Sequence, residues 1–304
     1  MTEQPTVWRA TGLYWANQTP RLGLVDPAGT ERTQPLPPGV ELGYQLGDQR
    51  HCIGIWLAHD QRRRPCPFRH PISPGATRAQ CQACSAADPG QLLARTAAVD
   101  DGRTYALYLA WFGTGLTKVG LTASERGTDR LADQAALAFT WLAHGPLPAV
   151  RAAEQAISAS GLAPERRQRR TKLAAWWQLP DHTQRQQQLA TAYQRIIEAV
   201  PWPAGLGQTP CQVVDQVDLF GLHALPGSCQ ELTGLNPGCI LRGTVRCAAG
   251  GDLLLDTISG PLLADTRLLA GWPLWPTTAS STGLELRDCD YARSNHGADQ
   301  TALF

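Results

Sequence analysis

The chain has 304 residues, of which 43% are hydrophobic and 17% charged, and its formal net charge is +1. This length suits roughly two or three compact units, and the apolar content is sufficient to bury a core without disulfides. We find no apolar run near the ~20 residues of a membrane-spanning helix and no apolar N-terminal stretch of the signal-peptide kind. These features argue against membrane-spanning, secreted, collagen-like and wholly disordered proteins, and we expect a cytoplasmic protein without a membrane partner.

Residues 1–50 are the first segment with a recognisable pattern. Short apolar stretches such as Leu22-Gly23-Leu24-Val25 alternate there with turn clusters such as Asp26-Pro27-Ala28-Gly29. This pattern is typical of a small antiparallel sheet. We therefore expect an N-terminal β-rich segment.

Residues 51–92 contain four cysteines in the pattern C-x13-C-x14-C-x2-C: Cys52, Cys66, Cys81 and Cys84. A Cys-x2-Cys pair places two sulfurs on one turn, and two further thiolates complete a tetrahedral Zn²⁺ site with Zn–S distances of ~2.3 Å. Such a site has no open position, so we expect a structural zinc knuckle. Free or redox-active thiols are the alternative, and His51, His59 and His70 are near enough in sequence to replace one cysteine.

Two groups of arginines indicate contact with phosphate. They are Arg62, Arg63, Arg64 and Arg69 beside the second cysteine, and Arg166, Arg167, Arg169 and Arg170 ahead of Trp176 and Trp177. A guanidinium offers a planar fork to phosphate oxygens, and an indole offers a face for a base. Basic residues outnumber acidic ones by 22 to 16 over residues 1–199, but acidic ones prevail by 10 to 5 over residues 200–304. We expect a nucleic-acid partner, with a solvated basic surface as the alternative.

Residues 104–122 predict a β-hairpin. Residues 104–111 alternate as a half-buried strand, Gly113-Thr114-Gly115 is a tight-turn sequence, and a second strand follows. A turn centred on Thr114 sets Ala110 opposite Lys118 and Tyr108 opposite Gly120. A phenol and an ammonium group then share one face beside a glycine, which indicates a site open to a ligand. Packing of Tyr108 in the core is the alternative.

Three helices are expected after the hairpin. The first runs through Leu131, Ala135 and Ala138 and follows Arg126 and Arg130. The second covers residues 148–157, contains Glu154 among small residues, and is ended by Gly161; the third lies near 183–200 and is stopped by Pro201. Residues 203–304 return to short strands separated by glycines, and we expect there a β-barrel-like module with a polar tail.

The order of these residues resembles the core of the GIY-YIG nucleases: Ala106-Leu107-Tyr108, nine residues, Lys118-Val119-Gly120, an arginine that opens a helix, then a helix with a single glutamate. The resemblance implies that Tyr108, beside Lys118, orients or deprotonates the attacking water. It also implies that Arg130, with Arg126 as competitor, neutralises phosphate charge. Glu154 would hold one Mg²⁺ or Mn²⁺ ion.

A second resemblance is to the bacterial family known as domain of unknown function 2797. It is carried by Cys52-Ile53-Gly54, Pro65-Cys66-Pro67, Gln80-Cys81-Gln82-Ala83-Cys84, and the segment from Tyr108 to Thr122. This likeness runs weakly along most of the chain and strongly from about residue 50 to 140. It names a family but implies no reaction.

Together these patterns predict an α+β protein with a GIY-YIG-like α/β core over residues 93–202, preceded by the zinc knuckle and flanked by the two β-rich modules. The expected function is a metal-dependent phosphodiester hydrolase that acts on DNA or RNA. The alternatives are a catalytically silent nucleic-acid-binding protein and an enzyme acting on a small nucleotide or phosphorylated substrate. The sequence predicts no oligomeric state.

Overall fold

A computed structural model describes residues 6–57, 62–88, 102–289 and 291 of the chain. The chain divides into two compact units. Unit 1 comprises Met1–Thr96 and Cys229–Cys289, and unit 2 comprises Ala97–Ser228 and Asp290–Phe304. Unit 2 is therefore inserted into the sequence of unit 1. Of the helices described, none is both long enough and apolar enough to cross a membrane.

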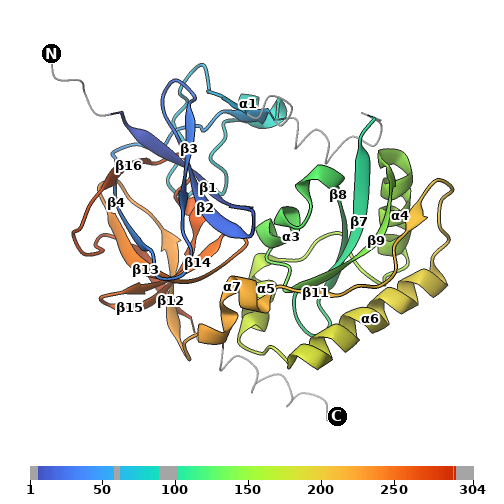
Figure 1. Ribbon diagram of the computed structural model, residues 1–304. Coiled ribbons are helices and arrows are strands. Elements are labelled where there is room, and N and C mark those ends of the chain that lie inside the picture. Colours follow the sequence, from blue (N-terminus) through green and yellow to red (C-terminus); the bar gives the residue numbers. More distant parts are fainter. Residues whose placement is uncertain (1–5, 58–61, 89–101, 290, 292–304) are drawn as a thin grey trace, which may run out of the picture. The chain divides into compact units, whose positions relative to one another are not determined.

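Unit 1 is built on a ten-stranded sheet with the order β17-β12-β15-β14-β13-β4-β16-β1-β2-β3 (Figure 1). Neighbouring strands pair antiparallel, except that β12 and β15 are parallel. The strands are β1 (Trp8–Ala16), β2 (Thr19–Val25), β3 (Glu31–Pro35), β4 (Glu41–Leu46), β12 (Cys229–Gly234), β13 (Ile240–Ala249), β14 (Asp252–Thr257), β15 (Gly260–Asp265), β16 (Pro273–Pro276) and β17 (Glu285–Cys289). A 3₁₀ turn, η3 (Thr266–Leu268), follows β15.

This sheet combines the two β-rich segments that the sequence placed in separate modules. β4 pairs with β13, with Tyr44 opposite Leu241, and β16 lies between β4 and β1. Residues 1–50 and Cys229–Cys289 thus share one unit, whose second part begins at Cys229 and not at residue 203. The expected polar tail also contributes β17. The alternation of apolar residues identifies each strand but carries no information on its partner, so the pairing was not visible in the sequence.

The cysteine segment adds a small substructure to unit 1. It consists of a two-stranded sheet of β5 (Ile55–Leu57) and β6 (Arg62–Arg64), followed by the short helix α1 (Gln82–Ala86).

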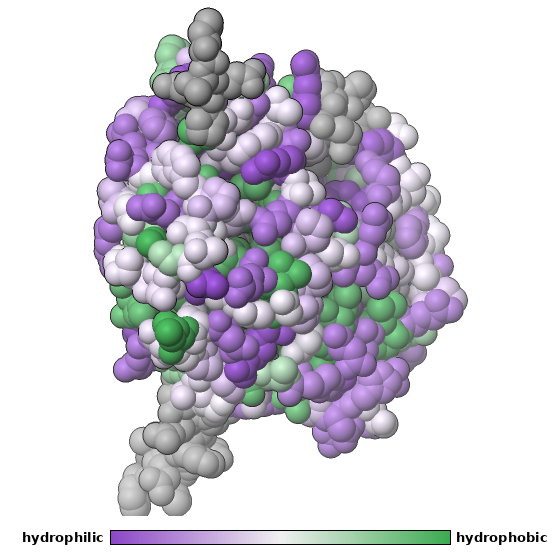
Figure 2. Space-filling view, turned by 60° about the vertical axis from the view of Figure 1, so that its left-hand side comes forward, coloured by the Kyte–Doolittle hydropathy of each residue, from purple (hydrophilic) through white to green (hydrophobic). Residues whose placement is uncertain are grey.

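On the face drawn in Figure 2, hydrophobic residues form small patches separated by hydrophilic ones. That view therefore shows no broad apolar area.

Unit 2 contains a sheet with the order β10-β9-β7-β8, in which β11 also pairs with β9 (Figure 1). Its strands are β7 (Thr104–Trp111), β8 (Thr117–Ala123), β9 (Ala138–Pro146), β10 (Gly207–Gln208) and β11 (Val214–Asp215). Its helices are η1 (Ser124–Arg126), α3 (Asp129–Asp133), α4 (Leu147–Ala159), α5 (Arg169–Trp176), α6 (His182–Ala199), α7 (Val217–Phe220) and η2 (Leu222–Ala224). The helices expected near 148–157 and 183–200 are thereby confirmed as α4 and α6.

The strand β7 is buried on both faces, whereas the sequence predicted a half-buried strand. On one face Trp111 donates a hydrogen bond from Nε1 to Gln188 of α6 at 3.1 Å. On the other face Tyr108 packs with Leu131 of α3 and Phe139 of β9. The sequence of the strand alternates between large and small side chains because alanines occupy part of the second face, although both faces are buried.

The helix expected through Leu131, Ala135 and Ala138 is wrong in its second half. Helix α3 ends at Asp133, Ala135 adopts a left-handed backbone with φ of +56°, and Ala138 begins β9. β9 pairs with β7 along its whole length, with Ala110 opposite Phe139. A run of small apolar residues fits a buried strand as well as a helix. Here the run forms a strand because it pairs with β7.

Candidate functional site

The four cysteines of the predicted zinc knuckle lie together in unit 1. Their sulfur atoms are all within 4.8 Å of one another, and all four residues are buried: Cys52, Cys66, Cys81 and Cys84. A tetrahedron with Zn–S distances of ~2.3 Å has S–S edges of ~3.8 Å. The Sγ atoms of Cys66 and Cys81 are 4.0 Å apart, so the cluster could hold a metal such as zinc with little adjustment.

Backbone amides around the cluster favour thiolates. The N–H groups of Gly54 and Cys81 donate to Cys52 Sγ at 3.4 and 3.2 Å. Burial acts to raise the pKa of Cys66, but hydrogen bonds from the backbone of His70 and Phe68 and from neighbouring cysteines lower it to about 7. Burial together with the adjacent thiols raises the pKa of Cys84. Cys66 therefore ionises readily, whereas Cys84 resists ionisation. A bound cation would stabilise the thiolate form of both residues.

Arg50 fixes the loop between the second and third cysteines. Its buried guanidinium donates to the carbonyl oxygens of Ser73, Pro74 and Ala76 at 3.2, 3.1 and 2.8 Å. It also donates to the carbonyls of Ala270 and Arg267 at 2.7 and 3.2 Å. Arg50 was not among the residues predicted to belong to this site. Its place two residues before Cys52 was the one available signal.

The first group of predicted phosphate-binding arginines divides in the structure. Arg63 forms an ion pair with Glu31 at 2.7 Å and lies over the Trp56 ring, so its charge is already compensated. Arg62 and Arg64, its neighbours in β6, are exposed. Arg69 is also exposed, and its φ of +44° is unusual for a residue with a side chain.

The hairpin register that the sequence predicted is confirmed. Tyr108 of β7 lies opposite Gly120 of β8, and Ala110 lies opposite Lys118. Lys118 Nζ donates to the Tyr108 hydroxyl at 3.1 Å. A Cβ atom at Gly120 would lie only 2.3 Å from that hydroxyl, so the glycine leaves the space that the phenol occupies.

The Tyr108 phenol is not open to solvent as expected, because α3 covers it. Only 1% of the residue is exposed, and the Gln134 side-chain amide donates to its hydroxyl at 2.7 Å. Gln134 and Lys118 are both half-buried. These two polar side chains therefore form the cover of the phenol, and they are the part of this site that solvent reaches.

Glu154 joins this cluster from α4. Burial, with a contribution from Glu165, raises the pKa of its carboxyl to about 7, while the charges of Lys118 and Arg151 and the backbone N–H of Leu121 oppose the shift. Lys118 thus interacts with both the phenol and the carboxyl group. Because the pKa lies near neutrality, Glu154 can hold or release a proton at physiological pH.

The two candidate arginines differ in their surroundings. Arg126 forms an ion pair with Asp133 at 2.5 Å. Arg130 lies in α3, one helical turn before Gln134, and is half-buried. Within the described part of the chain, no hydrogen bond or ion pair joins its guanidinium to Tyr108 or Glu154. The structure therefore brings Tyr108, Lys118 and Glu154 together and leaves Arg130 at the edge of the cluster.

The second arginine group lies at the start of α5. Arg166 and Arg170 are exposed and Arg169 is half-buried, whereas Arg167 donates from Nε to the carbonyl of Thr117 at 2.9 Å. The tryptophans that follow do not present free indole faces to a base. Trp176 is buried and stacks on Trp177, which in turn stacks on Tyr291 with ring centroids 4.9 Å apart.

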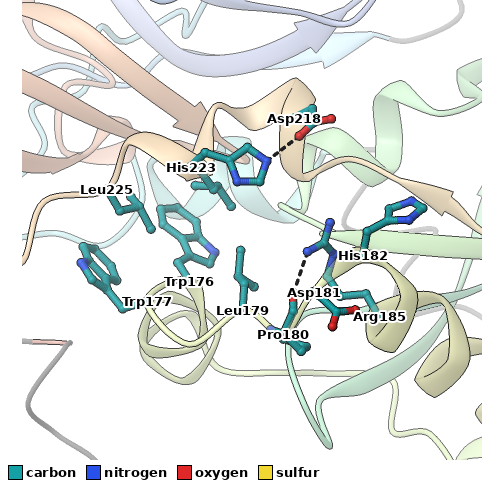
Figure 3. Close-up of a pocket in the computed structure, with 11 residues that line it drawn as sticks. Trp176, Trp177, Leu179, Pro180, Asp181, His182, Arg185, Asp218, His223 and Leu225 are labelled. Atoms are coloured by element: carbon teal, nitrogen blue, oxygen red, sulfur yellow. Dashed lines mark hydrogen bonds and ion pairs between the residues drawn. The ribbon is translucent and has the colours of Figure 1, made fainter.

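A pocket of ≈ 710 Å³ opens in unit 2 beside these tryptophans (Figure 3). Its apolar wall includes Trp176 and Leu179, and its rim carries an Asp218–His223 pair at 2.5 Å. Both members of the pair are largely exposed. This pocket was not predictable from the sequence, because its lining comes from two separate stretches, residues 176–185 and 218–225.

The comparison with known families gives a match to the one described as "Protein of unknown function (DUF2797)" over residues 78–274. No curated protein and no solved structure gives a significant match. The matched range includes Cys81, Cys84, Tyr108, Lys118 and Glu154, and it covers more than half of the chain. The resemblance noted in the sequence is confirmed in this respect: the chain belongs to the DUF2797 family of proteins of unknown function.

Proposed function

We propose that unit 2 is a GIY-YIG-like phosphodiester hydrolase that acts on DNA or RNA with a divalent cation. The observation that carries the proposal is the position of Lys118. It donates a hydrogen bond to Tyr108, and its positive charge acts to lower the pKa of Glu154. These three residues come from two strands and a later helix. The chemistry of their cluster suits a reaction that moves a proton beside a negatively charged group.

In this proposal Tyr108 first loses its hydroxyl proton to solvent and, as the phenolate, accepts a proton from the attacking water. An ordinary phenol has a pKa of ~10 and is a poor base at neutral pH. The Lys118 ammonium at 3.1 Å would stabilise the phenolate. Since Tyr108 is buried, Gln134, a long and partly exposed side chain, must first swing away from it, while Lys118 stays beside the phenol.

Glu154 is the residue that would hold the divalent cation. It offers one carboxyl group where burial disfavours negative charge, and a cation would compensate that charge. Mg²⁺ commonly keeps several waters and takes only one or two carboxylates, so a single glutamate is an acceptable protein ligand. When bound, the ion would polarise the scissile phosphate. Arg130 would neutralise the phosphate from α3, since its competitor Arg126 is held in an ion pair with Asp133.

The test is cleavage of labelled single-stranded and duplex DNA and RNA oligonucleotides with Mg²⁺ or Mn²⁺. Glu154→Gln should abolish cleavage and leave binding within about twofold, because it removes a metal ligand without adding charge. Glu198→Gln, on the exposed face of α6, is the matched control and should cleave as the wild type does. Tyr108→Phe should also lose cleavage. A wild-type protein that cuts none of the four substrates overturns the proposal.

The burial of Tyr108 favours a second candidate, a nucleic-acid-binding protein with a silent core. With 1% of the residue exposed, the phenol would serve only to position Lys118 and Gln134. The two candidates separate cleanly, since the silent protein binds the oligonucleotides but cleaves none of them before or after substitution of Glu154.

A further inference from the structure

We propose that the cysteine knuckle of unit 1 binds an unpaired nucleobase against the exposed ring of Phe68, with Arg62, Arg64 and Arg69 on the neighbouring phosphates. The preferred ligand would then be single-stranded or locally unpaired nucleic acid. This inference rests on the nucleic-acid partner of the proposed function, but it is independent of whether unit 2 cleaves that partner.

Phe68 stands out among the described residues by its exposure. It is 80% exposed, although Cys66, two positions earlier, is buried. The large hydrophobic residues of the described segments that reach 40% exposure are few: Phe68, Val214, Ile258, Trp275 and Leu286. Phe68 is the aromatic residue among them with most of its ring in solvent. A single exposed ring is common on protein surfaces, and it is the fixed turn and the nearby arginines in the sequence that make this one a candidate for ligand contact.

The turn that carries Phe68 is fixed by the cysteine cluster. The backbone N–H groups of Phe68 and His70 donate to Cys66 Sγ, and Arg69 N–H donates to the carbonyl of Cys66 at 3.1 Å. The carbonyl of Arg69 contacts His51 Nδ1 at 3.0 Å. Since these contacts hold the backbone of the turn against the cysteine cluster, little ordering of that backbone is required when a ligand binds.

The charge around the ring selects a polyanion. Residues 61–87 contain five arginines and no aspartate or glutamate. Arg63 forms an ion pair with Glu31. The side chains of Arg62 and Arg64 on β6 and of Arg69, next to Phe68 in the chain, are exposed. Guanidinium groups bind phosphate oxygens, and a flat exposed ring can stack on any base. Paired bases in a duplex do not present their faces, so the ring favours unpaired nucleotides.

An anionic membrane is the other polyanion with an apolar layer. One phenyl ring buries far less apolar area than a myristoyl chain, which by itself gives only marginal membrane binding. The stacked tryptophans of unit 2 do not compete for the base, because Trp176 is buried. The observations therefore favour nucleic acid, and vesicles become an arm of the test.

The experiment measures binding of the zinc-loaded full-length protein to fluorescent dT20, to a 20-base-pair duplex and to vesicles with 30% phosphatidylserine. Base stacking on an aromatic residue contributes about 1–3 kcal/mol, so Phe68→Ala should weaken dT20 binding by about 5- to 150-fold. Duplex binding should change by less than about twofold. Phe68→Trp should restore dT20 binding, and Ile258→Ala, at a residue 85% exposed elsewhere in unit 1, should have no effect.

Three outcomes would overturn the inference: dT20 binding unchanged in Phe68→Ala, an equal loss for dT20 and duplex, or tighter binding to vesicles than to dT20. Zinc content, measured in every variant, shows that the knuckle is intact. Failure of the hydrolase proposal looks different. A wild-type protein that never cleaves, yet loses dT20 binding in Phe68→Ala, supports this inference and contradicts only the hydrolase.

Discussion

Glu154→Gln provides a quantitative test of the cluster in unit 2 that needs no substrate. The pKa of this carboxyl is raised from 4.5 to about 7, chiefly by burial. The folded state therefore retains a proton that the unfolded state has lost, and stability decreases as pH rises from ~4.5 to ~7. A shift of this size corresponds to at most about 3 kcal/mol, of which about 2.5 kcal/mol develops between pH 5 and pH 8.

The glutamine variant cannot titrate, so it should gain stability relative to the wild type as the pH increases. Because Glu154 is partly exposed, we expect about 1–2.5 kcal/mol of relative gain, which is roughly 2–10 °C in Tm for a unit of this size. Calorimetry at pH 5 and pH 8 measures it, and Glu198→Gln on α6 is the control. An equal Tm difference at both pH values would refute the placement of Glu154 in a buried, charge-disfavouring position.

Three further predictions concern packing and the cysteine cluster. Gly120→Ala should destabilise unit 2 by about 1–3 kcal/mol in calorimetry, because the new methyl group meets the Tyr108 hydroxyl, and unchanged stability would contradict this packing. Cys81→Ser should abolish the tightly bound zinc, measured by elemental analysis, whereas Cys247→Ser should retain it, since Cys247 lies in β13 outside the cluster. Arg50→Met should cost more than about 3 kcal/mol in urea unfolding, because five carbonyl groups lose their donor, and a cost below about 1 kcal/mol would show that water replaces the guanidinium.

Local patterns in the sequence were sufficient for some parts of the structure. The hairpin register follows from a short turn and an alternating strand, so Tyr108 could be placed opposite Gly120 before any coordinates were known. The cysteine cluster was predictable because thiols have few other uses at that spacing. The family assignment rested on the same two stretches and was confirmed.

Parts that depend on distant packing could not be predicted. The cover over Tyr108 comes from Gln134, whose side chain carries no sign of that role in the sequence. The ion pair between Arg63 and Glu31 joins residues from separate strands, so the sequence alone treated four neighbouring arginines as equivalent. The strand β9 was mistaken for helix because its apolar run has no period that distinguishes the two.

The insertion of one unit into the other has a consequence for biosynthesis. Strands β1 to β4 and the four clustered cysteines leave the ribosome early, but the partner strands β13 and β16 follow only after all of residues 97–228 have been made. The inserted segment can complete its own sheet in the meantime, while the N-terminal strands still expose unpaired edges. A chain that ends before β13 would therefore keep the edges of β1 and β4 unpaired, and we expect it to aggregate or to bind chaperones.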